Sequence, residues 1–408
     1  MSGLLDSEDT RRTMEVMQAL GATVGLQGSG QALITGLDGR PCLKQGQDVL
    51  DLDVGESGTT CRLIAAVAAA GCGCFRLRGR GRMHERPIGA LAEALLALGV
   101  KIHWEGQPGF PPMLIETNSL AGGHVQLDLG ESSQYLSGLL LAAPLADKSM
   151  EIEISGRSVS RPYVSLTLAI MADFGITSKL LAFEQGGWRS IDPISFGSHT
   201  AQRFKFILQP GSYLARTYQV EGDWSNASYF LAAGALGPHP VSVSALKADS
   251  LQGDRVILDI LEQMGAKIAW SSSLVTVHGH GLRGIDVNME HCPDLVPTVA
   301  AVAAQASGRT VISGVAHLRL KESDRLAAVA AELGKAGAHV EILSDGLIVH
   351  GGGIAAGSRP VLSCHGDHRL AMSLSLLIFS DCRPFLDDPA CVKKSFPDFW
   401  KKWTLLTG

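Results

Sequence analysis

The chain has 408 residues, of which 46% are hydrophobic and 18% are charged, and its formal net charge is −5 at pH 7. This composition is typical of a globular protein with a well-packed core and excludes a disordered chain. A nucleic-acid-binding protein would carry a basic excess, so we expect no nucleic-acid partner, and any anion site must be a local group of Lys and Arg residues. A chain of this length is expected to form two domains of roughly 200 residues each.

The eight cysteines are scattered along the chain without a C-x-x-C motif. This spacing predicts free thiols, which are typical of the reducing cytoplasm, and it gives no zinc site. No apolar run has the length needed to span a membrane, and residues 1–6 lack the basic start and apolar core of a signal peptide. We therefore expect a cytoplasmic protein without a membrane partner.

Taken in chain order, five predicted amphipathic helices, the first from about Glu8 to Leu20, each end at a glycine that is followed by residues typical of a strand. Glycine adopts the left-handed backbone conformation that closes many helices. The glycines recur at intervals of between 72 and 90 residues, which indicates a repeated supersecondary unit. They are Gly21, Gly99, Gly175, Gly265 and Gly337.

Five further predicted helices alternate with these and are apolar on nearly all sides, which predicts that they are buried inside their domain. Each opens with small or polar residues, and such openings can converge and present backbone N–H donors at one place. The openings lie at Gly58, Ser132-Ser133-Gln134, Ser225, Asp294 and Asp367, and the apolar runs are 63–70, 136–146, 229–236, 295–304 and 370–379.

In each unit the buried helix precedes the amphipathic one, but the first amphipathic helix has no buried partner before it. The pattern therefore gives five and a half units of six, which predicts a domain at 1–221 with a truncated first repeat and a second domain at 222–408. We expect the missing half-unit to leave apolar surface uncovered near helices 63–70 and 136–146, where self-association could occur. The pattern also predicts a long hairpin at 181–212 and a short helix at 396–400.

The stretch 318–326 places two cations at the predicted start of a helix, for which Ser323 is the expected N-cap. Lys321 and Arg325 oppose the helix dipole there, so helix stability does not explain them. An anionic ligand would explain them, because backbone N–H groups, a Lys charge and an Arg fork together bind phosphate or carboxylate. On this stretch alone, an exposed first turn neutralised by Glu322 and Asp324 explains the charges equally well.

Further cations lie at equivalent places in the repeats, namely Arg62, Arg86, Arg369 and Lys394. Ser132, Ser133 and Gln134 add neutral hydrogen-bonding groups at one buried helix start. Asp294 adds a carboxylate at another, where a plain N-cap is the alternative. Together the residues predict a site for two anionic substrates with a carboxylate for proton transfer, in one cleft between the domains.

Apart from Asp294, these residues lie in eight blocks through which the whole chain resembles the 5-enolpyruvylshikimate-3-phosphate synthase family. The resemblance implies an α/β fold, a two-domain inside-out barrel built from βαβαββ repeats (the enolpyruvyl transferase fold). It also implies transfer of the enolpyruvyl group of phosphoenolpyruvate to the 5-hydroxyl of shikimate 3-phosphate with release of phosphate. This is the glyphosate-sensitive step of aromatic amino acid biosynthesis, catalysed by a monomer without metal or organic cofactor. The blocks are 4–9, 58–62, 82–89, 132–136, 160–163, 321–326, 367–372 and 394–398.

The resemblance also implies roles for individual residues. Proton transfer falls to Asp294, Glu322 and Lys321. Shikimate 3-phosphate is expected at Ser132, Ser133, Gln134, Ser160, Tyr163, Asp294, His317 and Lys321. Phosphoenolpyruvate is expected at Gly58, Arg86, Gln134, Arg325, Arg369 and Lys394.

The sequence departs from the family's pattern in three places. His317 stands where an Asn is usual, and Glu56 replaces a common Asn before Gly58. The family's first buried helix, part of an N-terminal segment of about 45 residues with a functional Lys, has no counterpart, as the repeat pattern also indicates. Three alternatives therefore stay open: an impaired remnant of the family, a chain with a misplaced start, and the related enolpyruvyl transferase acting on UDP-N-acetylglucosamine.

Overall fold

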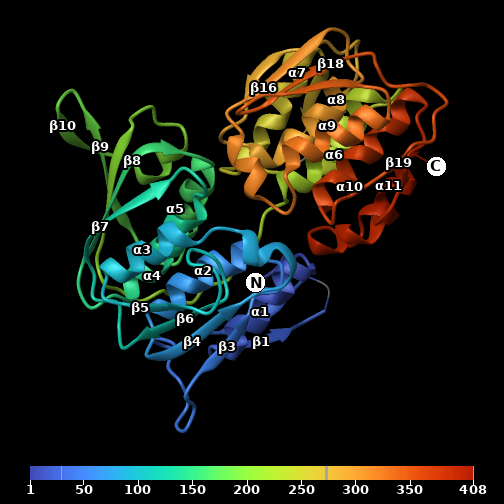
Figure 1. Cartoon of the computed structure of the whole chain (residues 1–408). Coiled ribbons are helices and arrows are strands. Elements are labelled where there is room, and N and C mark those ends of the chain that lie inside the picture. Colours follow the sequence, from blue (N-terminus) through green and yellow to red (C-terminus); the bar gives the residue numbers. More distant parts are fainter. Residues whose placement is uncertain (29, 272–273, 408) are drawn as a thin grey trace. The chain divides into compact units, whose positions relative to one another are not determined.

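The computed structural model describes residues 1–28, 30–271 and 274–407. The chain divides into two compact units, Met1–Val220 and Glu221–Gly408, coloured from blue to green and from yellow-green to red in Figure 1. Each unit has its own hydrophobic core. Within the described part of the chain, no helix combines the length and the apolar character needed to cross a membrane.

The first unit contains a partial repeat followed by two full ones. The partial repeat comprises α1 (Glu8–Ala19), β1 (Thr23–Leu26) and β2 (Ala32–Thr35). The next comprises β3 (Leu50–Asp53), α2 (Gly58–Ala69), β4 (Gly73–Arg78), α3 (Gly89–Ala97), β5 (Lys101–Trp104) and β6 (Met113–Thr117). The last comprises β7 (Gly123–Leu129), α4 (Gln134–Ala142), β8 (Met150–Ser158), α5 (Arg161–Asp173), β9 (Ser178–Glu184), β10 (Gly187–Ile191) and β11 (Arg203–Leu208).

The second unit follows the same order of elements. It begins with α6 (Trp224–Leu236), β12 (Val241–Ser244), α7 (Ile257–Met264), β13 (Lys267–Ser271) and β14 (Leu274–His278). It continues with β15 (Asp286–Asn288), α8 (Val296–Ala303), β16 (Arg309–Ser313), α9 (Arg325–Lys335), β17 (His339–Ile342) and β18 (Leu347–His350). It ends with β19 (Val361–Leu362), α10 (His368–Leu374), β20 (Phe385–Leu386) and α11 (Phe399–Thr407).

Short 3-10 helices lie between these elements. They are η1 (Gly81–Glu85), η2 (Ala143–Leu145), η3 (Pro193–Gly197), η4 (Gly253–Val256), η5 (Pro293–Leu295), η6 (Ala316–Leu320), η7 (Ser375–Ser380) and η8 (Pro389–Lys394).

The strand order shows the βαβαββ repeat expected from the sequence. The sheets β3-β4-β6-β5 and β15-β16-β18-β17 have identical orders. In both, the first two strands are parallel and the others pair antiparallel. Parallel strands need a crossover connection, and the apolar helices α2 and α8 provide it. The pairs β7–β8 and β19–β20 are also parallel, with α4 and α10 between their strands.

The five helices predicted to be buried are confirmed as buried. In α2, Ala65 and Ala66 have no exposed surface, and nearly all residues of α6 and α8 are buried. Helices α2 and α4 lie side by side in Figure 1 and pack closely, because a Cβ at Gly138 of α4 would lie 2.8 Å from the backbone oxygen of Arg62. These helices have no polar face, so burial is the arrangement that removes their apolar surface from water.

The glycines predicted to close the amphipathic helices are confirmed as well. All five have positive φ angles, where a side chain would be strained, and each follows the last residues of a helix. The φ angles are 114° at Gly21, 89° at Gly99, 87° at Gly175, 113° at Gly265 and 101° at Gly337.

Three sequence-based expectations are wrong. Asp324, not Ser323, caps α9 by accepting a hydrogen bond from the Ala327 N–H, because Ser323 instead donates to the buried Asp367. The last helix starts only at Phe399 and runs to Thr407.

The third wrong expectation is the uncovered surface near helices 63–70 and 136–146. Helices α2 and α4 cover each other and pack on the strands of their own repeats, so they are buried. Exposed apolar side chains lie instead on the hairpin β1–β2, where Leu26 is 65% and Leu33 62% exposed.

The helix packing predicts opposite effects for two Gly→Ala substitutions. In Gly138→Ala the new methyl group would meet the Arg62 oxygen at 2.8 Å and the Ala66 Cβ at 3.3 Å. Such overpacking costs about 1 to 3 kcal/mol, more than the roughly 1 kcal/mol that Ala gains in helix propensity. Gly334 of α9 is exposed, and a Cβ added there would have no atom within 4 Å, so Gly334→Ala should stabilise. Urea denaturation should show the two midpoints moving in opposite directions, and a shift in the same direction would contradict the packing argument.

Candidate active site

Arg325, the first residue of α9, is the centre of a buried ion network in the second unit. Its side chain is 1% exposed. Nη1 donates to Asp294 Oδ1 at 2.8 Å, Nη2 to Glu322 Oε2 at 2.8 Å, and Nε to Asp367 Oδ2 at 2.8 Å. One guanidinium therefore holds three carboxylates from three separate segments of the chain.

Two more cations complete this group, which we call the Arg325 network (Arg325, Arg369, Lys394, Asp294, Glu322 and Asp367). Arg369 Nη2 donates to Asp294 Oδ2 at 2.9 Å, and Lys394 Nζ donates to Glu322 Oε1 at 3.2 Å. Three cations thus face three carboxylates. The balance of charge explains how the group tolerates its burial.

The network lies where helices of the second unit begin. Asp294 belongs to η5, directly before α8, and Arg325 opens α9. Asp367 is the N-cap of α10, and its Oδ1 accepts from the Arg369 N–H at 3.0 Å. The sequence pattern predicted that the polar openings of the buried helices converge, and within this unit the openings of α8 and α10 do so.

The charges around Asp294 decide its protonation state. Burial by itself would raise the pKa of Asp294, but the positive charges of Arg369, Arg325 and Lys321 outweigh it and hold the pKa well below its usual range. Asp367 shows a similar balance: burial raises its pKa, but the positive charges nearby, Arg325 above all, together lower it by more. Both carboxylates are therefore ionised at neutral pH, as a proton acceptor must be.

Three residues beside this network were not predicted as site residues from the sequence. Asp223 caps α6 by accepting from the N–H groups of Ser225 and Asn226, and Ser225 Oγ donates to Asp254. Burial and the nearby Asp294 raise the pKa of Asp254 to about 6. Asp223 keeps exposed surface, but desolvation by the surrounding protein raises its pKa as well. Burial and Arg369 lower the pKa of His368 to about 3, so this histidine is neutral. The available signal was the pair of titratable residue types at helix openings, His368 at the start of α10 and Asp223 before α6.

His317 and Lys321 flank the network in sequence. His317 lies buried in η6, and Lys321 directly follows this 3-10 helix. Lys321 directly precedes Glu322 of the network, and its positive charge helps to lower the pKa of Asp294. The structure thus brings Asp294, Lys321, Glu322, Arg325, Arg369 and Lys394 together in one unit.

The first unit holds a second group of predicted site residues around the start of α2. Ser57 caps this helix by accepting from the Thr60 N–H. The buried Arg86 lies against the first turn, because a Cβ at Gly58 would collide with its guanidinium. Arg86 Nη1 also donates to the backbone oxygen of Glu56 at 3.4 Å. Only glycine at position 58 lets a guanidinium approach the helix N-terminus this closely.

Gln134 connects the starts of α2 and α4. Its Oε1 accepts from Arg62 Nη1 at 2.9 Å, and its Nε2 donates to Thr59 Oγ1 at 2.8 Å. Arg62 Nη2 in turn donates to the Pro87 carbonyl at 3.1 Å. Arg62 therefore orients Gln134 and ties it to the segment that carries Arg86.

The serines predicted to bind substrate lie at one edge of the sheet of the second full repeat. Ser132 and Ser133 are buried before α4, and Ser132 Oγ accepts from the Gln134 N–H at 3.2 Å. Ser160 precedes α5, which carries Tyr163 in its first turn. The strands before these helices are parallel neighbours, with Leu129 opposite Ser158, so both segments leave the sheet at the same edge.

Ser160 has an unusual backbone. Its φ of 54° lies in the left-handed region, which costs a non-glycine residue free energy and is common at functional sites. The following residue fixes this turn, because the buried Arg161 donates to the His199 carbonyl at 2.9 Å and lies over the rings of Phe196 and Phe204. The strain supports a binding role for Ser160.

The predicted site residues thus form two groups, one in each unit. Gly58, Arg86, Ser132, Ser133, Gln134, Ser160 and Tyr163 belong to the first unit, and Asp294, His317, Lys321, Glu322, Arg325, Arg369 and Lys394 belong to the second. A single cleft that holds both groups remains a prediction.

The raised pKa of Asp254 predicts a pH-dependent effect of Asp254→Asn on stability. An acid whose pKa rises from 3.8 in the unfolded chain to about 6 on folding destabilises the folded state once it is ionised. The penalty is absent below about pH 4 and complete above about pH 6, where it is on the order of 3 kcal/mol. The variant should therefore gain stability over the wild type between pH 4 and pH 7, measured by urea denaturation. Asp259→Asn, at an exposed position of α7, is the control, and an equal gain at both positions would refute the electrostatic explanation.

Comparisons with known proteins show the family of the chain. A family model described as EPSP synthase (3-phosphoshikimate 1-carboxyvinyltransferase) matches residues 1–180 and 196–403. A curated 3-phosphoshikimate 1-carboxyvinyltransferase from Shewanella baltica is 38% identical over 408 residues, covering 100% of this chain and 91% of the relative. One from a Marinomonas species is 39% identical with the same coverage.

Solved structures agree with the sequence relatives. An EPSP synthase from Acinetobacter baumannii superposes with a TM-score of 0.74 at 26% identity, covering 99% of this chain and 89% of that one. The family match spans nearly the whole chain and the curated relatives exceed a third identity, so the chain belongs to the EPSP synthase (3-phosphoshikimate 1-carboxyvinyltransferase) family.

Proposed function

We propose that the protein transfers the enolpyruvyl group of phosphoenolpyruvate to the 5-hydroxyl of shikimate 3-phosphate and releases phosphate. The observation that supports this most strongly is the Arg325 network, where an ionised Asp294 lies between Arg325 and Arg369. Both substrates are anions, and the reaction needs cations for their charge and a carboxylate for the hydroxyl proton.

In the proposed addition step, the 5-hydroxyl oxygen forms a bond to C2 of phosphoenolpyruvate. The hydroxyl proton passes to a carboxylate, and the methylene carbon gains a proton, which gives a tetrahedral intermediate. In the elimination step, the C2–O bond to phosphate breaks and the methyl carbon loses a proton, which restores the carbon–carbon double bond and gives the enol ether product. Atoms and charge balance in these steps without a cofactor.

Different residues of the second unit suit different steps of this reaction. Asp294 is the proposed acceptor of the 5-hydroxyl proton, since its lowered pKa keeps it ionised. Glu322, held between Arg325 and Lys394, is the proposed partner for the protons at the methylene carbon, with Lys321 beside it. Arg369 donates to Asp294 and Lys394 to Glu322, so an incoming phosphate or carboxylate would compete for these two cations.

The sequence suggested that Arg325 binds phosphoenolpyruvate, but we propose that its main role is to position other residues of the site. Its guanidinium already bonds to three carboxylates, so its first task is to hold Asp294 and Glu322 in place. A contact with phosphoenolpyruvate would add to that task. Replacing Arg325 with Ala would leave the buried Asp367 without its cation and would leave Asp294 and Glu322 with one cation each, and breaking a buried ion pair typically costs about 3 to 5 kcal/mol of stability. An Arg325 variant therefore cannot separate binding from folding.

In the first unit, the proposed ligands of shikimate 3-phosphate are Ser132, Ser133, Ser160 and Tyr163. Their segments leave neighbouring parallel strands at one edge, where hydroxyls and helix N-termini suit a phosphate. Arg86 beside Gly58 is the proposed contact for phosphoenolpyruvate. Gln134, fixed by Arg62 and Thr59, is proposed to contact both substrates. The proposal requires residues of both units to bind the same pair of substrates.

The assay of this proposal is phosphate release from phosphoenolpyruvate with either shikimate 3-phosphate or UDP-N-acetylglucosamine as acceptor. Release with shikimate 3-phosphate alone supports the proposal, and release with the nucleotide sugar alone supports the related transferase. Release with neither acceptor would favour a family member that has lost catalysis.

We further propose that the protein acts in the cytoplasm as a monomer.

Substitution of Lys321 should affect catalysis far more than stability. The positive charge of Lys321 acts on Asp294, while Arg325, Arg369 and Lys394 hold the carboxylates of the Arg325 network, so the network keeps these three cations when Lys321 is replaced. We expect Lys321→Ala to lower kcat/KM more than a hundredfold, which corresponds to a loss of about 3 kcal/mol of transition-state stabilisation. The measurement is steady-state phosphate release, with thermal unfolding in parallel.

Arg40→Ala is the matched control for this substitution. Arg40 pairs with Asp147 on the surface at 2.5 Å, and such exposed pairs contribute less than about 1 kcal/mol. Its removal should leave kcat/KM within a factor of about two. Equal losses at Lys321 and Arg40 would show that the second-unit site is assigned incorrectly.

A further inference from the structure

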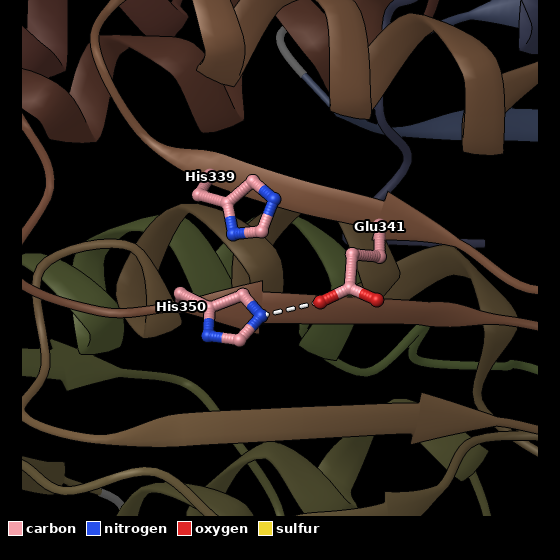
Figure 2. Close-up of side chains that lie close together, drawn as sticks. All are labelled: His339, Glu341 and His350. Carbon is pink, nitrogen blue, oxygen red and sulfur yellow. Dashed lines mark hydrogen bonds and ion pairs between the residues drawn. The ribbon is translucent and has the colours of Figure 1, made fainter.

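Three side chains that the proposed reaction does not use lie together on the hairpin β17–β18 of the second unit. Figure 2 shows His339 and Glu341 on one strand and His350 on the next. His339 and His350 are direct cross-strand partners. Glu341 follows His339 by two positions, so all three side chains belong to the same face of the sheet.

The geometry of this cluster resembles that of a metal site. One ligand atom from each residue lies within 4.8 Å of the other two. His350 Nε2 is 2.7 Å from Glu341 Oε1, and the two imidazole rings stack with their centroids 4.5 Å apart. His339 and Glu341 are exposed and His350 is half-buried, so an ion and its water ligands can reach the cluster from solvent.

We propose that His339, Glu341 and His350 bind a divalent transition-metal ion of the zinc class. Two imidazole nitrogens and one carboxylate oxygen are a common donor set for Zn²⁺ and Ni²⁺, with water in the remaining position. Tetrahedral metal–ligand bonds of about 2.0 to 2.1 Å place the donor atoms roughly 3.3 Å apart. The His350 and Glu341 donors, now 2.7 Å apart, would therefore separate slightly while the third donor adjusts its distance, and side-chain rotation on a fixed pair of strands allows both changes. The ion replaces the hydrogen bond between His350 and Glu341.

A second cluster of similar composition shows why charge favours the first. His124, Glu151 and Glu153 also bring their ligand atoms within 4.8 Å of one another. There, however, Lys205 Nζ lies 2.7 Å from Glu151 and Arg203 Nη2 lies 2.9 Å from Glu153. These cations already neutralise the carboxylates and repel a divalent ion.

The cluster on β17–β18 has a weaker competing charge. Arg309 is the cross-strand neighbour of His350 on β16, so it is the competing cation of this cluster. Arg309 Nη2 also lies 3.7 Å from Asp286 Oδ1, which offsets part of its charge. Glu341 Oε1 has the imidazole of His350 as a hydrogen-bond partner, and this imidazole can itself become a metal ligand.

The position of this cluster indicates a structural role. Helix α9 begins with Arg325 and ends just before β17, so the cluster and the Arg325 network are attached to opposite ends of one helix. An ion bound here would join β17 to β18 without contacting the reacting atoms. Binding to the folded state alone would raise the stability of the second unit in proportion to RT ln(1 + [L]/Kd).

The test is a calorimetric titration of Zn²⁺, and separately of Ni²⁺, into tag-free, chelator-treated full-length protein. The titration uses a Cys42→Ser, Cys72→Ser background, because these two cysteines are exposed neighbours whose thiols would also bind zinc. We expect one equivalent of metal to bind and Tm to rise with metal concentration. His339→Gln, Glu341→Gln and His350→Gln should each weaken binding at least about tenfold, since even outer-shell changes cost that much.

His124→Gln is the matched control, because it removes the histidine of the second cluster and should leave the titration unchanged. Circular dichroism of each metal-free variant should match the parent, since the substituted side chains lie at or near the surface. Absence of saturable binding would overturn the proposal. Binding that survives both His339→Gln and His350→Gln, or that is lost in His124→Gln, would overturn it as well.

Discussion

The burial of one guanidinium determines much of how the second unit is organised. A charged group that loses its water is costly unless paired groups surround it, and Arg325 is surrounded by Asp294, Glu322 and Asp367. Each partner comes from a segment at a helix start, so the ion pairs fix the starts of α8, α9 and α10 relative to one another. The helices in turn are held by their apolar faces. Charge pairing and apolar burial therefore define the same arrangement, and neither would do so alone.

The same arrangement contains features that oppose stability. Asp254 is a buried carboxylate with a raised pKa beside Asp294, and Ser160 has a strained backbone in the first unit. Residues of this kind persist when the surrounding structure fixes them and are concentrated at binding and catalytic sites. Their positions, next to the starts of α6 and α5, support the proposal that helix N-termini form the substrate-binding surfaces.

The sequence predicted those parts of the fold that depend on local patterns. A helix without a polar face has to be buried, and a glycine at the end of an amphipathic helix has to provide a left-handed turn, so α2, α8, Gly21 and Gly265 could be assigned without a structure. The failures depended on contacts between distant residues. Ser323 is a good N-cap by its residue type, but Asp367, more than 40 positions away, accepts its hydrogen bond. Similarly, no local signal showed that α2 and α4 would cover each other, or that Asp254 would lie beside Asp294.

The repeat explains why binding residues can be recognised at equivalent positions of a long chain. Where two parallel strands flank a buried helix, the segment before that helix leaves the sheet at a fixed edge, as the register of Leu129 with Ser158 shows. Each repeat therefore places a polar helix opening at that edge, where several substrate-binding residues can be located together.

The antiparallel strands at the end of each repeat are under a different constraint. One of their faces covers the core while the other faces solvent, so side chains such as His339 and His350 can vary without disturbing the helices. New ligand sites in this architecture are thus expected on the outer hairpins, whereas the helix openings are restricted by the buried charges that they hold.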